Sequence, residues 1–331
     1  METVYIVTGG CGYLGYSVVK QLREQNKKVR VFAIPREDSS KVKEIGAEVY
    51  IGDVRKIDSI EPIFEGEDLE FVVIHIAGIV TVETKFSQIV WDINVEGTKN
   101  IIELSKKYKT KKLVYLGSVD AIPPADNQVF SDYKDFDPDK VVTIYAKTKA
   151  VAINAVLKSA EDGLDACVIL PTAVFGPDDY AFGVVSKMVA VYASNKALPL
   201  IHGGYDFVDV RDLAAAIIAT TERGHKGEVY ILSGVHVDVK TFINEIRELQ
   251  GLKPINMVLP NWLSKTVGFF AEKSAGITKK PPVFTAYTIT CINSGVRYTS
   301  EKAQKDIGYK IRPRSESIKD MIEFMKQQGR L

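Results

Sequence analysis

A tyrosine and a lysine four positions apart, Tyr145 and Lys149, are the pair of side chains in this sequence best suited to proton transfer. Residues 145–160 have helical spacing, and positions i and i+4 share one helix face, so the phenol and the ammonium should converge. A free phenol has a pKa of about 10, too high for efficient proton transfer at neutral pH, and a nearby ammonium lowers it. The pair is a candidate acid/base for interconverting a carbonyl and an alcohol, although such pairs also occur in helices by chance.

Three further polar side chains are candidates for the same site. Ser118 follows an apolar stretch at 112–116, and its hydroxyl would hold a substrate carbonyl beside Tyr145 or simply cap a turn. Asp53 follows the stretch at 48–51 and would accept a hydrogen bond from an adenine amino group or form an Asx turn. Asn94 lies inside a helical stretch, where asparagine is mildly unfavourable. It would bridge the backbone and an active-site water, or face solvent.

The first fifteen residues predict a site for a nucleotide pyrophosphate. An apolar strand at 4–7 leads into Gly9, Gly12 and Gly15, and residues 13–23 then take helical spacing. The first glycine permits a tight turn, the second lets the backbone approach the phosphates, and the third lets the helix lie close to the strand. The spacing is Gly-x-x-Gly-x-x-Gly, and an ordinary glycine turn is the alternative. The strand before the loop and the helix after it favour the nucleotide site.

Strand and helix patterns alternate through the first half of the chain. Strands are predicted at 29–34, 48–51, 71–76, 112–116 and 165–170, and helices at 39–45, 57–64, 84–108 and 145–160. Strands this apolar, joined by helix-length connections, indicate a parallel sheet covered on both faces. We therefore predict a doubly wound α/β fold, whose ligand lies at the carboxyl ends of the strands.

The second half has a looser pattern and predicts a smaller lobe interleaved with the sheet. Helices are predicted at 182–194, 213–222, 241–249, 262–275 and 315–327, and strands at 207–210 and 228–232. We expect residues 1–172 to bind the dinucleotide and residues 173–331 to form the substrate lobe. We also expect residues 207–233 to return to the main sheet.

The composition excludes several classes of protein. The 331 residues are 46% apolar and 26% charged with a net charge of +1, so there is no electrostatic case for nucleic acid or an anionic membrane. The three cysteines and four histidines show no metal-ligand spacing, and no metal site is predicted. Neither a leader pattern nor an apolar run of about 18 residues is present. We expect a cytoplasmic protein without a membrane span.

In combination, these motifs resemble the extended branch of the short-chain dehydrogenase/reductase superfamily. The matching stretches run through almost the whole chain in order: Thr8–Gly15, Gly52-Asp53, His75–Gly78, Asn94–Thr98, Ser118, Tyr145-x-x-x-Lys149, Leu170–Pro177, Phe207–Leu213, Tyr298–Ala303 and Ile307–Tyr309. Within that branch the chain looks most like the dihydroflavonol reductase and 3β-hydroxysteroid dehydrogenase group.

The resemblance implies a Rossmann domain, a nicotinamide cofactor and a catalytic Ser118–Tyr145–Lys149 triad supported by Asn94. Hydride would pass from the reduced cofactor to a carbonyl carbon while Tyr145 gives the proton, and the reverse reaction would oxidise an alcohol. The resemblance also implies cofactor contacts from Thr8, Gly9, Gly12, Tyr13, Leu14, Gly15, Arg36, Asp53, Val54, Ala77, Gly78, Tyr145, Lys149, Pro171, Thr172 and Val174. It allows a homodimer.

The choice between NAD and NADP depends on the end of the second strand. An enzyme that uses NAD usually carries an acidic residue there to bind the ribose hydroxyls. Ala33 and Ile34 stand at that place, and the next charged residue is Arg36, which would pair with the 2′-phosphate of NADP. Glu37 and Asp38 follow directly and would weaken that attraction. The sequence favours NADP and leaves NAD open.

Three functions compete. The first is a reductase or dehydrogenase of a lipophilic carbonyl or alcohol, the second a nucleotide-sugar epimerase or dehydratase with tightly bound NAD, and the third a non-catalytic cofactor sensor. A sugar diphosphate needs arginine or lysine, but residues 201–206 contain neither, and Arg211 is expected to pair structurally with Asp209 and Asp212. The amphipathic stretch at 262–270 would close an apolar lid over a pocket. Together with the complete triad, these features favour the first function.

Overall fold

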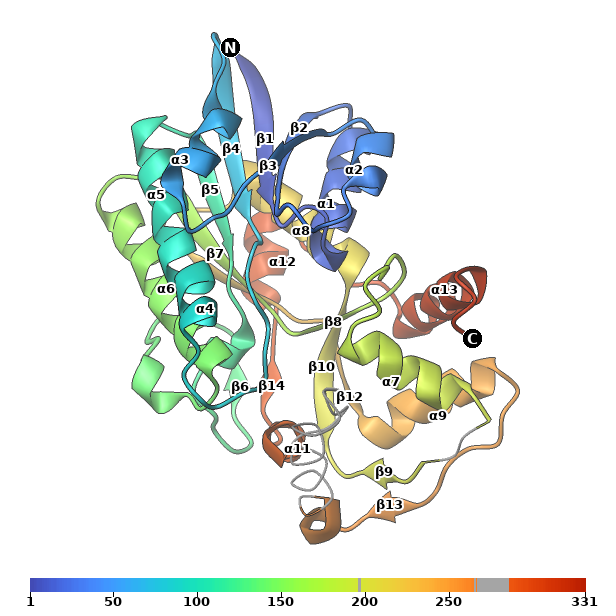
Figure 1. The fold of residues 1–331 in the computed structure, drawn as a ribbon. Helices are drawn as coiled ribbons and strands as arrows, with labels where there is room; N and C mark the ends of the chain where they lie inside the picture. Colours follow the sequence, from blue (N-terminus) through green and yellow to red (C-terminus); the bar gives the residue numbers. More distant parts are fainter. Residues whose placement is uncertain (196–197, 265, 267–285) are drawn as a thin grey trace.

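The central feature of the computed structural model is a seven-stranded sheet in which every neighbouring pair is parallel. The structure describes residues 1–195, 198–264, 266 and 286–331. The strand order is β11-β7-β5-β4-β1-β2-β3 (Figure 1). The bounds are β1 (Glu2–Thr8), β2 (Lys28–Ala33), β3 (Glu48–Ile51), β4 (Leu69–His75), β5 (Lys112–Leu116), β7 (Ala166–Pro171) and β11 (Val229–Leu232). The predicted doubly wound fold is confirmed.

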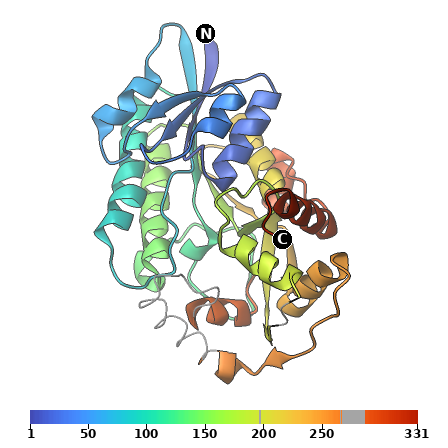
Figure 2. The same cartoon turned by 45° about the vertical axis from the view of Figure 1, so that its right-hand side comes forward.

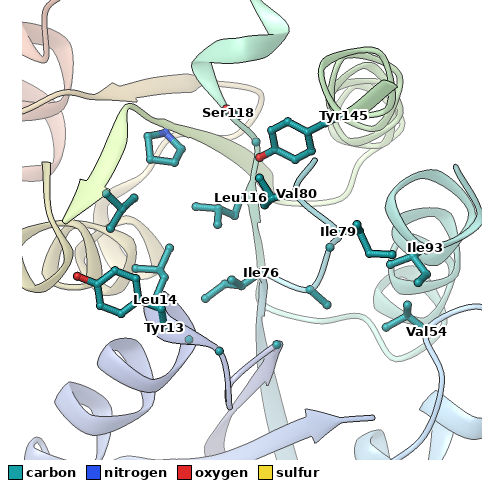
Figure 3. A pocket seen from close by; sticks show the side chains of 18 of the residues that line it. Tyr13, Leu14, Val54, Ile76, Ile79, Val80, Ile93, Leu116, Ser118 and Tyr145 are labelled. Atoms are coloured by element: carbon teal, nitrogen blue, oxygen red, sulfur yellow. The ribbon is translucent and has the colours of Figure 1, made fainter. Parts of the chain in front are cut away.

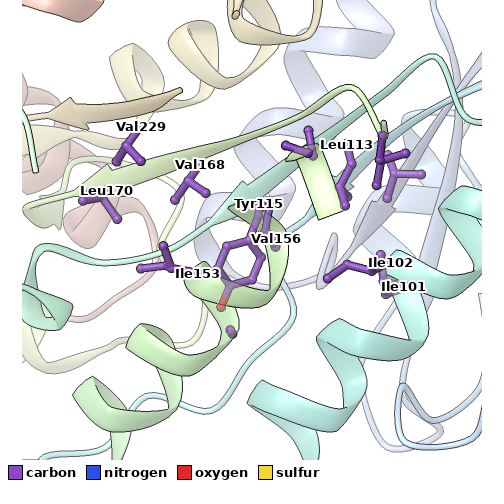
Figure 4. Packing of buried hydrophobic residues seen from close by; sticks show 14 of the residues in the cluster. Ile101, Ile102, Leu113, Tyr115, Ile153, Val156, Val168, Leu170 and Val229 are labelled. Atoms are coloured by element: carbon purple, nitrogen blue, oxygen red, sulfur yellow. The ribbon is translucent and has the colours of Figure 1, made fainter. Parts of the chain in front are cut away.

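Helices cover both faces of this sheet because the strands are apolar on both sides. One face packs against α3 (Ile57–Ile60), α5 (Gly97–Lys107) and α6 (Ile144–Glu161). In Figure 4, Ile101 of α5 and Ile153 of α6 approach the strands that carry Tyr115 and Leu170. The other face packs against α1 (Tyr13–Glu24), α2 (Ser40–Glu44), α8 (Val210–Arg223) and α12 (Glu301–Ile307).

A smaller lobe lies beyond the carboxyl ends of the strands (Figure 2). Its sheet combines β8 (Ala173–Phe175), β10 (Gly204–Asp209) and β12 (Val235–Asp238). Its helices are α7 (Val184–Ala193), α9 (Val239–Leu249) and α13 (Arg314–Gln327), and the three share one apolar core with the sheet.

The expected return of residues 207–233 to the main sheet is only partly realised. Helix α8 packs on the main sheet and β11 pairs with β7, as expected. Strand β10 instead pairs with β8 and β12 in the lobe. The reason is aromatic packing, because Phe207 of β10 stacks on Phe242 of α9 with ring centroids 4.4 Å apart.

The C-terminal part of the chain crosses back to the dinucleotide-binding half. Strand β14 (Arg297–Tyr298) pairs with β6 (Val129–Phe130), and α12 then packs on α8 and β11. Two hydrogen bonds of Ser300 stabilise this crossing, because its hydroxyl accepts from Ser233 N at 2.7 Å and donates to Ser233 O at 3.0 Å. Further short elements are η1 (Glu61–Phe64), η3 (Val119–Ala121), η4 (Pro138–Lys140), β9 (Leu200–Ile201), β13 (Val258–Leu259) and α11 (Ala286–Asn293).

The helix predicted over 84–108 is interrupted. The structure has α4 (Gln88–Trp91), a π-helical turn at Asp92–Glu96 and then α5, while residues 84–87 are not helical. The π turn contains Asn94, whose side chain is engaged by the loop after β4, and π turns often occur at functional sites. Most of the helix predicted over 262–275 lies outside the described residues.

Candidate active site

The glycine loop between β1 and α1 has the geometry that the sequence predicts. Gly9 has φ +70°, and a Cβ placed on it would lie 2.9 Å from Ala77 N at the end of β4. A Cβ on Gly15 would lie 2.0 Å from Gly9 O. Both glycines are therefore required, one for the turn and one for the approach of α1 to the strand. Gly12 is the N-cap of α1 and has no side-chain capping bond, so backbone N–H groups remain available for an anion.

A cleft of about 500 Å³ runs from this loop along the carboxyl ends of the strands (Figure 3). Fourteen of the predicted site residues line it: Gly9, Gly12, Tyr13, Leu14, Gly15, Asp53, Val54, Ala77, Gly78, Ser118, Tyr145, Pro171, Thr172 and Val174. Four others, Thr8, Arg36, Asn94 and Lys149, do not appear in its lining. The cleft brings the loop, the serine and the tyrosine to one site.

Ser118 and Tyr145 face each other across one end of the cleft, and the Tyr145 hydroxyl points towards the serine in Figure 3. The two side chains line the same cleft and are 7% and 8% exposed. Tyr145 is the second residue of α6, whose start is fixed by Thr143 Oγ1 accepting from Ala146 N at 3.1 Å. Ser118 begins the loop after β5, where its Oγ accepts from Asp120 N at 3.2 Å.

Burial, rather than the lysine, controls the protonation of Tyr145. Burial and the neighbouring Asp120 carboxyl raise the pKa of Tyr145 above its usual value, and the hydrogen bond with Ser118 lowers it in part. Lys149 is not among the groups that shift this pKa, although its Nζ lies 5.9 Å from the centroid of the Tyr145 ring. Lys149 Nζ donates to Leu116 O at 2.5 Å and to Tyr115 Oη at 3.3 Å. Tyr145 is therefore a neutral phenol at pH 7, the form that donates a proton.

Lys149 is buried beside this hydroxyl pair, and burial lowers its pKa to about 7. A Cβ on Gly78 would be 3.7 Å from Lys149 Nζ, so the ammonium lies directly behind the glycine wall of the cleft.

The Asn94 side chain joins the loop after β4 to helix α6 by hydrogen bonds. Its side chain accepts from Ile79 N at 2.8 Å and donates to Ile79 O at 3.0 Å and to Thr148 Oγ1 at 3.0 Å. The loop after β4 is thereby tied to α6 next to Lys149. These bonds supply the backbone contact that the sequence predicts for Asn94, and Oδ1 keeps one further acceptor position; its bridge to an active-site water stays a prediction.

Thr8 lies behind the cleft and supports it. Its Oγ1 is 2.6 Å from His75 Nδ1 and accepts from Ala77 N at 3.2 Å. His75 Nε2 is 3.0 Å from Thr98 Oγ1, which confirms that this histidine is a packed, hydrogen-bonded core residue. Burial lowers the pKa of His75 to about 3, so it is neutral. Thr8 therefore fixes the ends of β1 and β4, and its contact with the cofactor stays a prediction.

The adenosine end of the cleft contains carboxyl groups. Glu37 lines it, whereas Arg36 is exposed outside it. Asp53 lines it as predicted and is paired with Arg55, whose Nη2 lies 2.5 Å from Asp53 Oδ2. No lysine or arginine appears among the described residues of the lining. The sequence favours Arg36 because it is the first charged residue after β2. The turn after β2 instead places the following residue, Glu37, in the lining of the cleft.

The residues present fit a nicotinamide dinucleotide along this cleft. The glycine loop and the N-terminus of α1 suit a pyrophosphate. At the opposite end, the buried Thr172 Oγ1 has no hydrogen-bond partner among the described residues. An orphaned hydroxyl beside Pro171 and Val174 suits a polar group at the edge of a nicotinamide ring. The three residues predicted for that end therefore form a plausible wall for it.

Sequence reasoning missed several residues that the cleft brings together: Glu37, Ile76, Ile79, Val80, Ile93, Leu116 and Asp120. Five are apolar residues at strand ends, in the loop after β4 or in the π turn, which a motif does not single out. Asp120 could have been found, since it follows Ser118 by two positions in a loop at the sheet's carboxyl edge. Among the aromatic residues of the substrate lobe, Tyr180 and Phe182 are half-buried and Trp262 is 70% exposed. Tyr180 contacts Phe324, and Phe182 lies under Arg330.

The prediction for Arg211 can also be compared with the structure. Arg211 is structurally paired, as expected, although its partners are Asp209 at 2.8 Å and Asp320 at 2.5 Å rather than Asp212. In the part of the chain that the structure describes, no cluster of histidine, cysteine and carboxylate side chains could hold a metal ion. In the same part, no helix combines the length and apolar character needed to cross a membrane.

Comparisons with known proteins agree with this geometry. The family model described as "NAD dependent epimerase/dehydratase family" matches residues 5–233. Sterol demethylase protein B of Methylococcus capsulatus is 25% identical, with 98% of each chain covered. A putative dihydroflavonol 4-reductase of Synechocystis is 22% identical, covering 99% of this chain and 96% of that one. The crystal structure of gox2253 superposes with a TM-score of 0.85 at 27% identity over 99% of each chain.

Proposed function

Because the chain belongs to the NAD dependent epimerase/dehydratase family, we propose that it interconverts a ketone or aldehyde and an alcohol on a lipophilic small molecule by hydride transfer. The observation that carries the proposal is the Ser118–Tyr145 hydroxyl pair at the end of a cleft with mostly apolar walls. Two hydroxyls that converge on one point suit a carbonyl oxygen, and the apolar surroundings suit the hydrocarbon part of a substrate.

In reduction, Ser118 and Tyr145 hold the carbonyl oxygen by two hydrogen bonds, which polarise the carbonyl group. Bound reduced nicotinamide supplies the hydride to the carbonyl carbon. Tyr145 donates its phenolic proton to the oxygen as the negative charge develops there, so that an alcohol results. Lys149 supplies a positive charge behind the site that stabilises the tyrosinate left after proton transfer. Oxidation of an alcohol would use the same groups in reverse.

The charges of the cleft favour this function over nucleotide-sugar chemistry. A sugar diphosphate carries negative charge that needs arginine or lysine contacts. The described lining holds the carboxyl groups of Glu37, Asp53 and Asp120 and no basic side chain, while Arg211 is committed to its own ion pairs. The names of the sterol demethylase and dihydroflavonol reductase relatives also support a lipophilic substrate.

The carboxyl groups in the lining of the cleft favour a different cofactor from the one that the sequence favours. We propose NAD rather than NADP, because Glu37 and not Arg36 lines the adenosine end of the cleft. A carboxylate there would accept hydrogen bonds from ribose hydroxyls and would repel a 2′-phosphate.

A panel of carbonyl compounds tests the proposed function. Steroid ketones, flavanonols and simple aldehydes are offered with NADH and with NADPH, and oxidation of the cofactor is followed by its near-ultraviolet absorbance. At least one lipophilic carbonyl should be reduced. Tyr145→Phe should retain cofactor binding and lose about 10²- to 10⁴-fold in turnover, since it lacks the proton donor. Conversion of UDP- or dTDP-sugars, with no cofactor oxidation on any carbonyl, would overturn the proposal.

A further inference from the structure

Lys149 is a buried cation whose hydrogen-bond partners carry no charge. The residue is 3% exposed. In the described part of the chain its ammonium donates to the carbonyl oxygen of Leu116 at 2.5 Å and to the hydroxyl of Tyr115 at 3.3 Å. A buried charge is costly unless hydrogen bonds or an opposite charge replace the lost water. These two oxygens therefore determine whether and where the ammonium can be held.

Tyr115 contacts this ammonium through both its hydroxyl and its ring. Besides the hydrogen bond to Oη, Lys149 Nζ lies 4.8 Å from the centroid of the Tyr115 ring, within the range of a cation–π interaction. Tyr115 is 1% exposed, and its ring extends from β5 towards α6 in Figure 4. Burial raises the pKa of Tyr115, so its hydroxyl stays neutral and keeps a lone pair for Lys149.

The two hydrogen bonds leave one N–H of the ammonium without a partner among the described residues. An ammonium has three donors, and Leu116 O and Tyr115 Oη, both on β5, take two of them. A Cβ placed on Gly78, which lines the cleft, would be 3.7 Å from Nζ. Because glycine has no side chain, only its backbone separates the ammonium from the cleft. The bond to Tyr115 therefore helps to fix how the remaining N–H and the positive charge face the cleft.

The other titratable groups around Lys149 do not neutralise its charge. The Tyr145 ring, on the same helix, has its centroid 5.9 Å from Nζ and carries a neutral phenol. His75 of β4 is also neutral, and the charge of Lys149 helps to keep it so. Asp120 shifts the pKa of Tyr145 but is not among the groups that shift the pKa of Lys149. Tyr115 is thus the side chain left to stabilise the charged form of the lysine.

We propose that Tyr115 is a positioning residue, which holds the Lys149 ammonium behind Gly78 through its hydroxyl and its ring and so keeps a positive charge beside the Tyr145 phenol. The proposal rests on the proposed function, because that function gives the charge its task, the stabilisation of the tyrosinate formed in reduction. Loss of the Tyr115 hydroxyl leaves a second N–H of the buried ammonium unpaired, which favours the neutral amine.

Tyr115→Phe keeps the ring and removes only the hydroxyl. On the carbonyl compound that the wild type reduces fastest, kcat and kcat/KM are measured from about pH 6 to about pH 9 with saturating NADH. Near neutral pH both should fall about 10-fold with KM nearly unchanged. The reason is that Tyr115 lies outside the described lining of the cleft, while the charge acts on the transition state. The alkaline limb of the profile should move about one unit to lower pH.

Tyr230→Phe is the matched control. Tyr230 lies on β11 of the same sheet and is fully buried, and its Oη accepts from His225 N at 3.0 Å. Lys302 Nζ lies 5.7 Å from its ring centroid, but the described lining of the cleft does not include this tyrosine. Tyr230→Phe should therefore cost stability and leave the pH profile unchanged. A Tyr115→Phe profile that coincides with the wild type, or an equal displacement in Tyr230→Phe, would overturn the proposal.

A double-mutant cycle tests the contact without substrate and so separates it from the proposed function. Unfolding by urea is measured for the wild type, Tyr115→Phe, Lys149→Met and the double variant at about pH 6 and about pH 9. At the acidic pH the ammonium is charged, so Tyr115→Phe should lower the folding equilibrium constant about 10-fold more in the presence of Lys149 than in the Lys149→Met background. At the alkaline pH, above the pKa of about 7, this difference should shrink. Tyr230→Phe should show no coupling to Lys149→Met.

A purely structural role of Tyr115 in the core predicts equal losses of stability in both backgrounds at both pH values. That outcome overturns the proposal even if ketones are reduced. If the coupling is present but no carbonyl compound is turned over, the proposed function fails and the role of Tyr115 in the reaction fails with it.

Discussion

Replacing Glu37 with glutamine should change which dinucleotide the protein prefers. Glu37 lines the cleft beyond β2, where its two carboxylate oxygens can each accept from a ribose hydroxyl. A hydrogen bond to a charged group contributes about 1.5–3 kcal/mol, so loss of one such bond should weaken NADH binding about 10- to 100-fold. The amide keeps the shape of the side chain and one acceptor, so the fold should be unaffected.

The effect on NADPH should be opposite in sign. A 2′-phosphate carries about −1.5 to −2 charges, and at roughly 6 Å with an effective dielectric constant of about 20 a single carboxylate repels each charge by about 3 kcal/mol. Solvent and salt reduce this figure because the carboxyl is only half-buried. The wild type should therefore prefer NADH by a factor of order 100, and Glu37→Gln should bring the preference below about 10.

Titration of each cofactor, followed by nicotinamide fluorescence, measures both affinities. Burial raises the pKa of Glu37, so its charge is present above that pKa and is lost as the pH falls through it. The wild-type preference for NADH should accordingly shrink at the acidic end of the range, and that of Glu37→Gln should not. Arg36→Ala serves as the control because this exposed side chain lies outside the cleft. A selective loss of NADPH affinity in Arg36→Ala, or an unchanged ratio in Glu37→Gln, would refute the reasoning.

Three further substitutions test the site. Lys149→Met should be inactive, and its stability relative to the wild type should be greatest near pH 6 and decline towards pH 9 in thermal unfolding. Burial lowers the pKa of Lys149 to about 7, so the cost of its buried charge is fully present below that pH and shrinks progressively between that pH and the unfolded pKa of about 10.4; a pH-independent difference would argue against this. Gly15→Ala should lose most of its NADH affinity in a binding titration, because its Cβ would lie 2.0 Å from Gly9 O and α1 must shift. Asn94→Ala should unfold at a temperature several degrees lower, since it leaves Ile79 N and O unpaired, and it should raise KM more than it lowers kcat.

Much of the fold follows from the sequence because the strands are short apolar runs bounded by glycine, proline or aspartate. The stretches at 48–51 and 112–116 match β3 and β5 residue for residue. The glycine loop and the Tyr145 helix could be placed because each depends on local spacing. Ser118 could be placed because the carboxyl ends of parallel strands meet at one edge.

The remainder depends on contacts between distant parts of the chain. The π turn around Asn94 forms because Ile79 and Thr148 both engage its amide, and neither is near it in sequence. The pairing of β10 with the lobe sheet rather than with the main sheet depends on its stacking against α9. The pKa values of Tyr145 and Lys149 depend on how deeply each is buried, and spacing along a helix carries no information about that.

Because β14 and α12 cross back to the dinucleotide-binding half, they affect how the chain folds during synthesis and how a truncated fragment behaves. During synthesis, β7 lacks its neighbour until β11 has emerged, and β11 lacks the helix that covers it until α12 is complete. A fragment that ends at residue 172 would present Ala166–Pro171, all six of them buried in the complete chain, as an open sheet edge. Such an edge is a template for pairing with other chains. The open edge of the main sheet is therefore paired only by β11 and covered there by α12. Nearly the whole chain must be synthesised before both of these elements are available.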